Sequence, residues 1–430
     1  MNNTLTTNKW LRIGVLCILY FAQGFPWGFM LTALLSFLAS KGLTIIESGQ
    51  LTAMAYLPWT FKLFWGPVID SFTYKTMGRR RPWILLAQFG MALTLIAMVF
   101  MGDLTSNITL LGWMFFLHNC FASLQDVSCD ALAVDILLPD EQGKVNGAMW
   151  GSKIIGTGTG AALMGTILVS NGLIFTVIIQ TILMFGIMAF PLFILERPGE
   201  KRFPWSREIV ETKEISSSIQ NPMIVISDLL KAFSKPPCLF AGLFILLSAM
   251  NQGVNGAVLP VFYNKTLGWE SDTYSQFVGV PGTILEFIGA ILGGVLADRY
   301  GRRKFFFLGW GSFSVFSGIF GFMIMSGQAI PYWFQIFYLV VPPFFIAIGT
   351  VSMFALAMAL SWSKASATMF TSYMALANLS VVIGNKLIGP LTSVFEIGEI
   401  YVMMMVICLL PVVFLKRMDP TLILNIKSEN

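Results

Sequence analysis

Twelve long apolar runs dominate the sequence, and they restrict the chain to folds that cross a membrane. A helix needs about 20 apolar residues to cross the hydrocarbon core of a bilayer. Runs of that size fall at residues 12–38, 48–69, 83–101, 109–138, 145–169, 172–195, 237–262, 274–297, 304–326, 332–360, 365–392 and 398–415. Charged residues make up only 11% of the chain, against about 25% in an average soluble domain. The sequence therefore predicts an all-α membrane protein with twelve transmembrane helices.

The basic residues are distributed unevenly between the loops that join these runs. If the N-terminus lies inside, the inside loops and termini hold 22 of the 27 lysines and arginines. The outside loops hold Lys41 and Lys265, and the remaining three, Lys62, Lys153 and Lys386, fall within apolar runs. Basic residues are retained on the cytoplasmic side of a membrane. We therefore expect both termini in the cytoplasm, and the net charge of +5 does not indicate a nucleic-acid partner.

A polar stretch divides the chain into two halves of similar size. Residues 196–236 separate six apolar runs from six, and so short a stretch with few apolar residues cannot build a core of its own. We expect an N-terminal bundle at residues 1–195, a cytoplasmic linker at 196–236 and a C-terminal bundle at 237–430. Small residues such as Gly156, Gly158 and Gly160 lie within a predicted span, where they let helices approach closely.

A short loop pattern occurs at the same place in both halves. Residues 294–304 contain a glycine, an aspartate four residues later and a Gly-Arg-Arg turn, and a looser copy lies at 66–70 and 78–81. This pattern resembles the loop signature of the major facilitator superfamily of transporters. The resemblance implies two parallel six-helix halves, with spans 1, 4, 7 and 10 around a solute site near the midplane. It also implies that the loops act as gates, through Asp70, Arg79, Arg80, Asp298, Arg302 and Arg303.

Four charged residues lie deep within the predicted spans of the first half. Counting at about 1.5 Å per residue, Lys62, Asp130 and Lys153 lie roughly 12–14 Å from the cytoplasmic ends, and Asp126 lies one turn deeper on the same helix face as Asp130. A charge at this depth is costly and needs a reason. We expect the two lysines to neutralise the two aspartates. The cluster either fastens spans 2, 4 and 5 together, or binds a polar or anionic solute or carries a proton.

Glu286 is the buried carboxylate of the second half. The sequence places no lysine or arginine at its depth in that half, and desolvation disfavours an uncompensated charge. We therefore regard Glu286 as the leading proton-coupling residue, although an ion pair with Lys153 across the two halves is an alternative. His118, the one histidine, is expected at a helix interface or in a proton relay. Asp135 is expected to face the turn at residues 78–80.

Uncharged polar residues gather on spans that the resemblance places around the cavity. Amide side chains recognise hydroxyl and amide groups, and an indole can stack on a sugar ring. Hydrogen bonding between helices is the alternative role of each. The candidate solute-binding residues are Gln23 and Trp27 on span 1, Asn119 and Gln125 on span 4, and Asn251, Gln252 and Asn255 on span 7.

Three strings in the first half narrow the family. Residues 61–70, 78–83 and 125–135 contain Phe-Lys-x-x-Trp-x-Pro and Gln-Asp-x-x-x-Asp. They resemble the AmpG-type muropeptide permeases and the related acetyl-coenzyme A transporters. AmpG-type permeases import anhydromuropeptides with protons across the bacterial inner membrane, and relatives in the wider group are associated with siderophores.

These observations together predict a proton-coupled importer of a polar solute, such as a muropeptide-like amino sugar, a peptide or a siderophore. An exporter or antiporter of the same fold is an alternative, and a sensor or scaffold that transports nothing is another. An enzyme is not expected, because no nucleophile–base pair or metal-ligand set shares one face. The five cysteines have no metal-ligand spacing. We expect no metal or cofactor beyond a proton gradient, and a monomer in the bacterial inner membrane.

Overall fold

The computed structural model describes residues 4–72, 77–138, 141–203, 233–360 and 366–418. The side chains of residues 63, 70, 71, 143 and 366–368 also lie outside the described part. Throughout the described ranges the secondary structure is helical, as the sequence predicts. The first half contains α1 (Lys9–Gly28), η1 (Phe29–Leu34), α2 (Leu35–Ser40), α3 (Ile45–Thr60), η2 (Lys62–Phe64), α4 (Trp65–Ser71), α5 (Arg81–Val99), α6 (Ile108–Ile136) and α7 (Gln142–Phe193).

The second half repeats this arrangement with several interrupted helices. It contains α9 (Pro236–Ser248), α10 (Met250–Val261), η3 (Phe262–Thr266), α11 (Ser271–Phe277), η4 (Val278–Gly282), α12 (Thr283–Tyr300), α13 (Arg302–Met325), α14 (Tyr332–Val340), α15 (Pro342–Leu360), α16 (Ser366–Thr392), α17 (Ile397–Leu409) and η5 (Leu410–Met418). The π-helical turns η1 and η3 occupy equivalent places in the two halves.

Nine helical segments of the described residues are long and apolar enough to cross a membrane. One of them, at residues 144–193, is divided at Gly172, whose φ of 80° interrupts the helix. The helices α3 and α6 lie in the second and fourth predicted spans but are not among these nine, and α3 has only 16 residues before the break at Phe61. The protein is therefore an integral membrane protein built from long helices.

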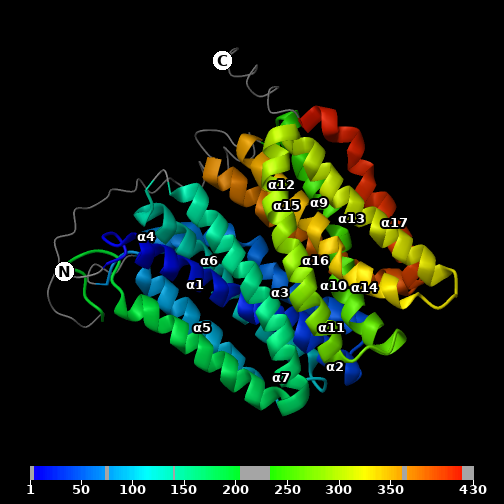
Figure 1. Cartoon of the computed structure of the whole chain (residues 1–430), viewed down its shortest axis with the longest axis horizontal. Helices are drawn as coiled ribbons and strands as arrows, with labels where there is room; N and C mark the ends of the chain where they lie inside the picture. Colours follow the sequence, from blue (N-terminus) through cyan, green and yellow to red (C-terminus); the bar gives the residue numbers. More distant parts are fainter. Residues whose placement is uncertain (1–3, 73–76, 139–140, 204–232, 361–365, 419–430) are drawn as a thin grey trace.

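Each half has hydrophobic cores of its own. The buried members of two large clusters come from residues 5–187, and those of two others come from residues 238–418. Figure 1 shows the corresponding grouping, with the blue-to-green helices on one side and the yellow-to-red helices on the other. Burial of apolar surface stabilises each group separately, so the boundary between the two groups is where movement is least costly.

Glycine allows the closest helix contacts in both halves. Cβ atoms added at Gly24 and Gly160 would collide with the carbonyl oxygens of Lys153 and Phe25, so α1 and α7 pack backbone to backbone. In the second half a Cβ at Gly253 would likewise collide with the carbonyl oxygen of Val381, between α10 and α16. The packing role expected for the glycines near residue 156 is confirmed, and the paired contacts reflect the internal repeat.

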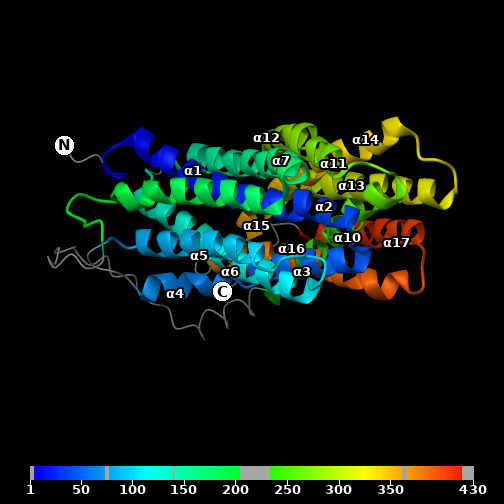
Figure 2. The same ribbon diagram turned by 90° about the horizontal axis from the view of Figure 1, so that it is seen from below.

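The two halves are tied together at one end of the molecule. We call this the loop end, because it carries the turns at residues 41–44 and 267–270. Lys265 Nζ donates to Gly42 O at 2.8 Å, and Ser271 Oγ donates to Ser36 O at 2.9 Å. Figures 1 and 2 both show α2, α10 and α11 together at this end. At the opposite end, the termini end, α1 begins and η5 finishes.

Candidate functional site

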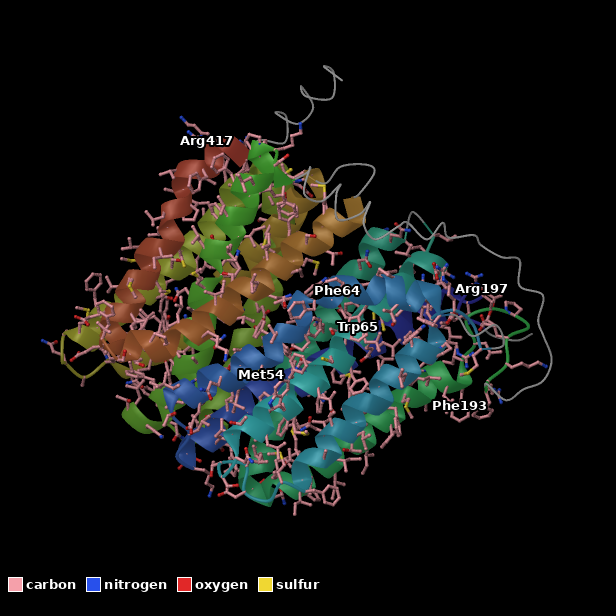
Figure 3. The ribbon with its side chains drawn as sticks, turned by 180° about the vertical axis from the view of Figure 1, so that it is seen from behind. Met54, Phe64, Trp65, Phe193, Arg197 and Arg417 are labelled. Carbon is pink, nitrogen blue, oxygen red and sulfur yellow. The ribbon has the colours of Figure 1, made fainter. Side chains whose placement is uncertain are left out.

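A break in the second membrane helix carries Lys62 into the interior of the first half. Pro58 has no N–H to donate, and three residues later the α-helix gives way to the short segment η2. Trp65 Nε1 donates to Ser123 Oγ at 2.9 Å, which fastens this segment to α6 (Figure 3). Lys62 Nζ then lies 3.1 Å from Asp126 Oδ2, and both side chains are about 5% exposed.

The charge cluster predicted from the sequence is confirmed, with one difference in its pairing. Lys153 Nζ on α7 lies 3.6 Å from the other oxygen of the same carboxylate, Asp126 Oδ1. Asp130 accepts a hydrogen bond from the Tyr20 hydroxyl on α1 rather than pairing closely with either lysine. The expected neutralisation is therefore uneven, because both lysines share Asp126.

Aromatic rings surround the Lys153 ammonium. Its Nζ lies 4.5 Å from the ring centre of Trp59, 5.2 Å from that of Trp150 and 6.0 Å from that of Tyr20. A cation within about 6 Å of a ring face is attracted by the ring quadrupole. Asn119 Oδ1 accepts from Trp59 Nε1 at 3.0 Å. Asn119 therefore orients the ring that faces Lys153, a positioning role rather than the direct contact with solute that the sequence suggests.

The second half supplies the opposite wall of the site. Glu286 lies in the first turn of α12, directly after the π-helical turn that contains Pro281. Its half-buried carboxylate is close enough to act electrostatically on the Tyr56 hydroxyl of α3. Trp27 packs edge-on against Tyr56, with ring centres 4.8 Å apart. Tyr56 of the first half and Glu286 of the second therefore lie near each other at the boundary between the halves.

No cation is found within ion-pairing distance of Glu286 in the described part of the chain. Lys153, which could have crossed to it, is directed to Asp126 instead.

An aromatic pair also joins the two halves at this site. The ring centres of Trp150 on α7 and Phe354 on α15 are 5.8 Å apart across the boundary between the halves. We define the central site by these residues of both halves: Tyr20, Trp27, Tyr56, Trp59, Lys62, Asp126, Asp130, Trp150, Lys153, Glu286 and Phe354.

The remaining predicted polar residues fall into two groups. Gln125 Nε2 donates to Leu19 O at 3.2 Å, and Asn255 Oδ1 accepts from the hydroxyls of Tyr338 and Tyr401. These two amides hold neighbouring helices together. Three others retain polar groups that could meet a solute. Both side-chain amide atoms of Gln23 and the Nδ2 of Asn251 are buried without a hydrogen-bond partner among the described residues, and Gln252 is half-buried.

His118 lies away from the central site. Its Nδ1 is 2.9 Å from Thr94 Oγ1 on α5, and the side chain is buried. This contact joins α5 to α6, which agrees with the expectation of a histidine at a helix interface.

The two loop signatures differ in their contacts. In the first, Arg80 Nε donates to Asp135 Oδ2 at 2.9 Å, as expected. The backbone N–H of Arg80 donates to Glu196 Oε1. Arg79 belongs to the same turn, and the Asp70 side chain lies outside the described residues. In the second, Asp298 pairs with Arg302 at 3.2 Å, and both side chains are largely exposed. Arg303 reaches Leu415 O at 3.4 Å.

A buried carboxylate outside the membrane-spanning segments joins the first of these turns. Glu200 is 3.6 Å from the buried Arg81 guanidinium. Burial, together with the Glu196 carboxylate, raises the pKa of Glu200 to about 7, because the nearby arginine offsets only part of these two effects. This end of the first half therefore contains a carboxylate that titrates near neutral pH.

Most of the aromatic residues of the central site are not predicted from the sequence. Tyr20, Tyr56, Trp59 and Trp150 do not stand out there, because aromatic residues are common throughout the apolar runs. A usable signal was present in their spacing. Trp150 precedes Lys153 by three residues, Trp59 precedes Lys62 by three, and Tyr20 precedes Gln23 by three. Residues three or four apart share a helix face, so Tyr20 and Trp150 each lie beside a predicted polar residue, and Trp59 lies close to Lys62 in the chain.

Comparison with known proteins identifies relatives that are permeases. The anhydromuropeptide permease of Escherichia coli K12 is 26% identical over 404 residues, covering 89% of this chain and 74% of that protein. A transporter named AmpG 4 of Rickettsia conorii is 27% identical over 301 residues, covering 68% of this chain and 69% of that protein. The resemblance to the AmpG group is therefore confirmed, and these relatives are transporters rather than enzymes.

Solved structures with the same fold are transporters as well. The nucleoside transporter NupG superposes with a TM-score of 0.70 at 13% identity, covering 94% of this chain and 99% of that chain. A POT family transporter in complex with a thioalcohol-conjugated peptide also has a TM-score of 0.70, at 12% identity, covering 95% and 96%. The family model described as Major Facilitator Superfamily matches residues 16–282 and 241–429, so the chain belongs to that superfamily.

Proposed function

We propose that this protein is a proton-coupled importer of a small polar solute and works by alternating access. The solute would be a muropeptide-like amino sugar or peptide, or a siderophore. We further propose twelve membrane crossings with both termini in the cytoplasm, in a bacterial inner membrane. Bundles at residues 1–195 and 237–430 would move as units joined by the linker at 196–236, within a monomer. The proton gradient would be the driving force, with no bound cofactor.

One observation carries the proton-coupled part of this proposal. Glu286 lies where the two halves meet, beside Tyr56, and no cation compensates it among the described residues. Keeping a carboxylate charged inside a membrane without a partner is costly, and a proton is the simplest countercharge. Asp126 is held between two lysines, so a change in its charge would disrupt an ion pair, and Asp130 is bound by the Tyr20 hydroxyl. Glu286 has no ion pair or hydrogen bond of this kind among the described residues, so a proton can neutralise it without breaking such a contact.

The arrangement of the halves supports alternating access. Hydrogen bonds at the loop end hold the halves together there, whereas the buried members of each of these hydrophobic cores come from one half. Rocking of one bundle against the other can therefore change which side of the membrane has access to the boundary that carries Tyr56 and Glu286. With the termini in the cytoplasm, the present structure would be closed toward the outside.

Transport by reconstituted protein tests the proposal. Purified protein in liposomes that enclose a pH-sensitive dye is given muropeptides, a siderophore or N-acetylmuramic acid from outside. Import with protons should acidify the interior when the correct solute is added, and an inward proton gradient should drive its accumulation. Alkalinisation of the interior would indicate proton antiport instead. Protein that neither moves protons nor exchanges any candidate solute would contradict the proposal.

A Glu286→Gln variant tests the assigned coupling residue in the same liposomes. Glutamine resembles the protonated carboxyl group, so the variant should bind and exchange solute but fail to accumulate it against a gradient. Glu270→Gln is a suitable control, because Glu270 lies in the turn before α11, away from the central site. If Glu286→Gln accumulates solute like the parent, Glu286 is not the coupling residue, and Asp126 becomes the better candidate.

A further inference from the structure

The two lysines of the charge cluster are held unequally by their shared carboxylate. Lys62 Nζ makes a hydrogen bond of 3.1 Å with Asp126 Oδ2, and its side chain is 5% exposed. Lys153 Nζ is 3.6 Å from Asp126 Oδ1, which is longer than a hydrogen bond, and its side chain is 18% exposed. The aspartate is therefore committed mainly to Lys62. The Lys153 ammonium keeps hydrogen-bonding capacity that Asp126 does not use.

The surroundings of Lys153 favour an incoming anion. The rings of Trp59, Trp150 and Tyr20 stabilise the positive charge through their faces. Those rings do not supply the oxygen acceptors that an ammonium group prefers. Trp150 is 40% exposed, so part of its ring is open to a ligand. A carboxylate beside a flat group could bind Lys153 while the flat group stacks on this ring.

The opposite wall of the site determines how such a solute would be oriented. Glu286 lies on that wall, with Tyr56 of the first half near it. A carboxylate of the solute would be repelled by Glu286 whenever Glu286 is charged. Hydroxyl and amide groups, in contrast, can bind both Glu286 and Tyr56. The anionic end of the solute would therefore point toward Lys153, and its neutral polar end toward Glu286.

We propose that Lys153 is the anion-binding residue of the central site and that the solute carries a carboxylate next to a ring, such as a sugar ring, one face of which can pack on Trp150. This inference rests on the proposed function only in taking the central site as the solute site. It assigns different roles to the two lysines: Lys62 keeps Asp126 in place, and Lys153 binds the solute. Asn119 supports Lys153 indirectly, because it orients Trp59.

The test compares two sugars that differ by one carboxylate. N-acetylmuramic acid carries a lactyl ether carboxylate that N-acetylglucosamine lacks. Binding to purified protein is followed by tryptophan fluorescence at matched ionic strength, with no gradient required. The parent should bind N-acetylmuramic acid at least about 10-fold more tightly than N-acetylglucosamine, as expected for a charge-assisted hydrogen bond. That preference should shrink as salt is raised.

Variants separate binding from structural support. Lys153→Gln should weaken binding of N-acetylmuramic acid to the level of N-acetylglucosamine and leave the neutral sugar unchanged. Lys153→Arg should restore most of the preference. Lys386→Gln is the matched control, because Lys386 is exposed on α16.

A parent that binds both sugars equally, or fails to bind N-acetylmuramic acid saturably, overturns the inference even if Lys153→Gln does not fold. Equal loss for both sugars in a folded Lys153→Gln protein also overturns it. Failure of proton-driven transport alone would leave these binding results intact and would count against the proposed function.

Discussion

At the scale of single residues, the main feature is that one buried carboxylate serves two buried lysines. Asp126 lies between Lys62 on the broken helix and Lys153 on α7. Burying charged groups is costly unless they are paired, so Asp126 makes the presence of both lysines tolerable. Asp130 is a poorer substitute, since the Tyr20 hydroxyl already occupies one of its oxygens. The cluster therefore depends on Asp126 more than on any other member.

Replacing Asp126 with Asn should destabilise the protein, because it leaves two buried ammonium groups without their carboxylate. Breaking a buried ion pair costs about 3–5 kcal/mol, so expression and melting temperature in detergent should both fall. Asp103→Asn is the control, because Asp103 is exposed and its Oδ1 contact with Thr105 survives in asparagine. Melting of Asp126→Asn at the parent's temperature would contradict this role. A double variant with Lys62→Gln should recover part of the loss.

Glu200 should make the stability of the protein depend on pH. Burial and the Glu196 carboxylate raise its pKa from about 4.5 to about 7 in the folded protein. The folded state therefore holds a proton that the unfolded state releases between these values, so stability from Glu200 is full below about pH 4.5 and falls as pH rises to about 7. The melting temperature should fall by a few degrees between pH 5 and 7.5, beyond the change seen in Glu200→Gln. Identical pH profiles for the two proteins would disprove this assignment.

At the scale of helices, close packing through glycine determines where the site residues lie. Gly24 and Gly28 on α1 oppose Gly156 and Gly160 on α7, and the added atoms of larger residues would collide with backbone carbonyls. This approach brings Tyr20 of α1 near Lys153 of α7. The interruptions matter equally, because the break at η2 turns Lys62 inward and the π-helical turn η4 precedes Glu286.

A Gly160→Val substitution should therefore separate α1 from α7 and disturb the central site. Overpacking of this kind costs about 1–3 kcal/mol, and the new side chain would meet backbone rather than a flexible side chain. The melting temperature should fall, together with binding of any solute that uses Lys153. Gly186→Val, in the part of α7 beyond Gly172, is the control, because nothing lies within 4 Å of a Cβ added there. Equal melting of the two variants would show that close packing at Gly160 is unimportant.

At the scale of the whole molecule, two separately packed bundles meet along a boundary that is held at the loop end. Hydrogen bonds there include Ser271 with Ser36 and Gln276 with Thr166, and helices also pack closely across the boundary, since a Cβ added at Gly158 would collide with Gly279 O. Each hydrogen bond contributes little to stability, whereas separating either hydrophobic core would be expensive. The structure therefore favours movement of the halves as rigid units over rearrangement within either half.

Cross-linking the loop end should stop transport by preventing this movement. Cysteines can be introduced at Ser36 on α2 and Ser271 on α11, where the Ser271 hydroxyl reaches the backbone carbonyl of Ser36 in the other half. Joining them with a short thiol cross-linker should abolish solute accumulation, and a cleavable linker should allow recovery after reduction. The two single-cysteine variants, treated in the same way, are the controls. Full transport by a cross-linked protein would show that the loop end does not open during the cycle.

Much of the architecture followed from the sequence because it depends on properties that are local in the chain. Long apolar runs predict membrane helices wherever they occur, and matching loop signatures near residues 70 and 298 indicate a repeat without reference to any contact. The ionised residues within apolar runs also had to meet one another, because lipid offers no partner. The pairing of Arg80 with Asp135 was predictable because Asp135 lies near the end of its apolar run, where it can face the turn at residues 78–80.

Only the tertiary structure decided which partner each of these residues has. Lys153 could have paired with Asp130 or Glu286, and the close packing of α1 on α7 directs it to Asp126 among three aromatic rings. Asn119 and Asn255, which resemble binding residues in the sequence, instead hold Trp59 and two tyrosines. These outcomes depend on distances of a few ångströms between helices that are far apart in the chain. Local composition determines which residues enter the membrane, whereas helix packing determines which of them meet.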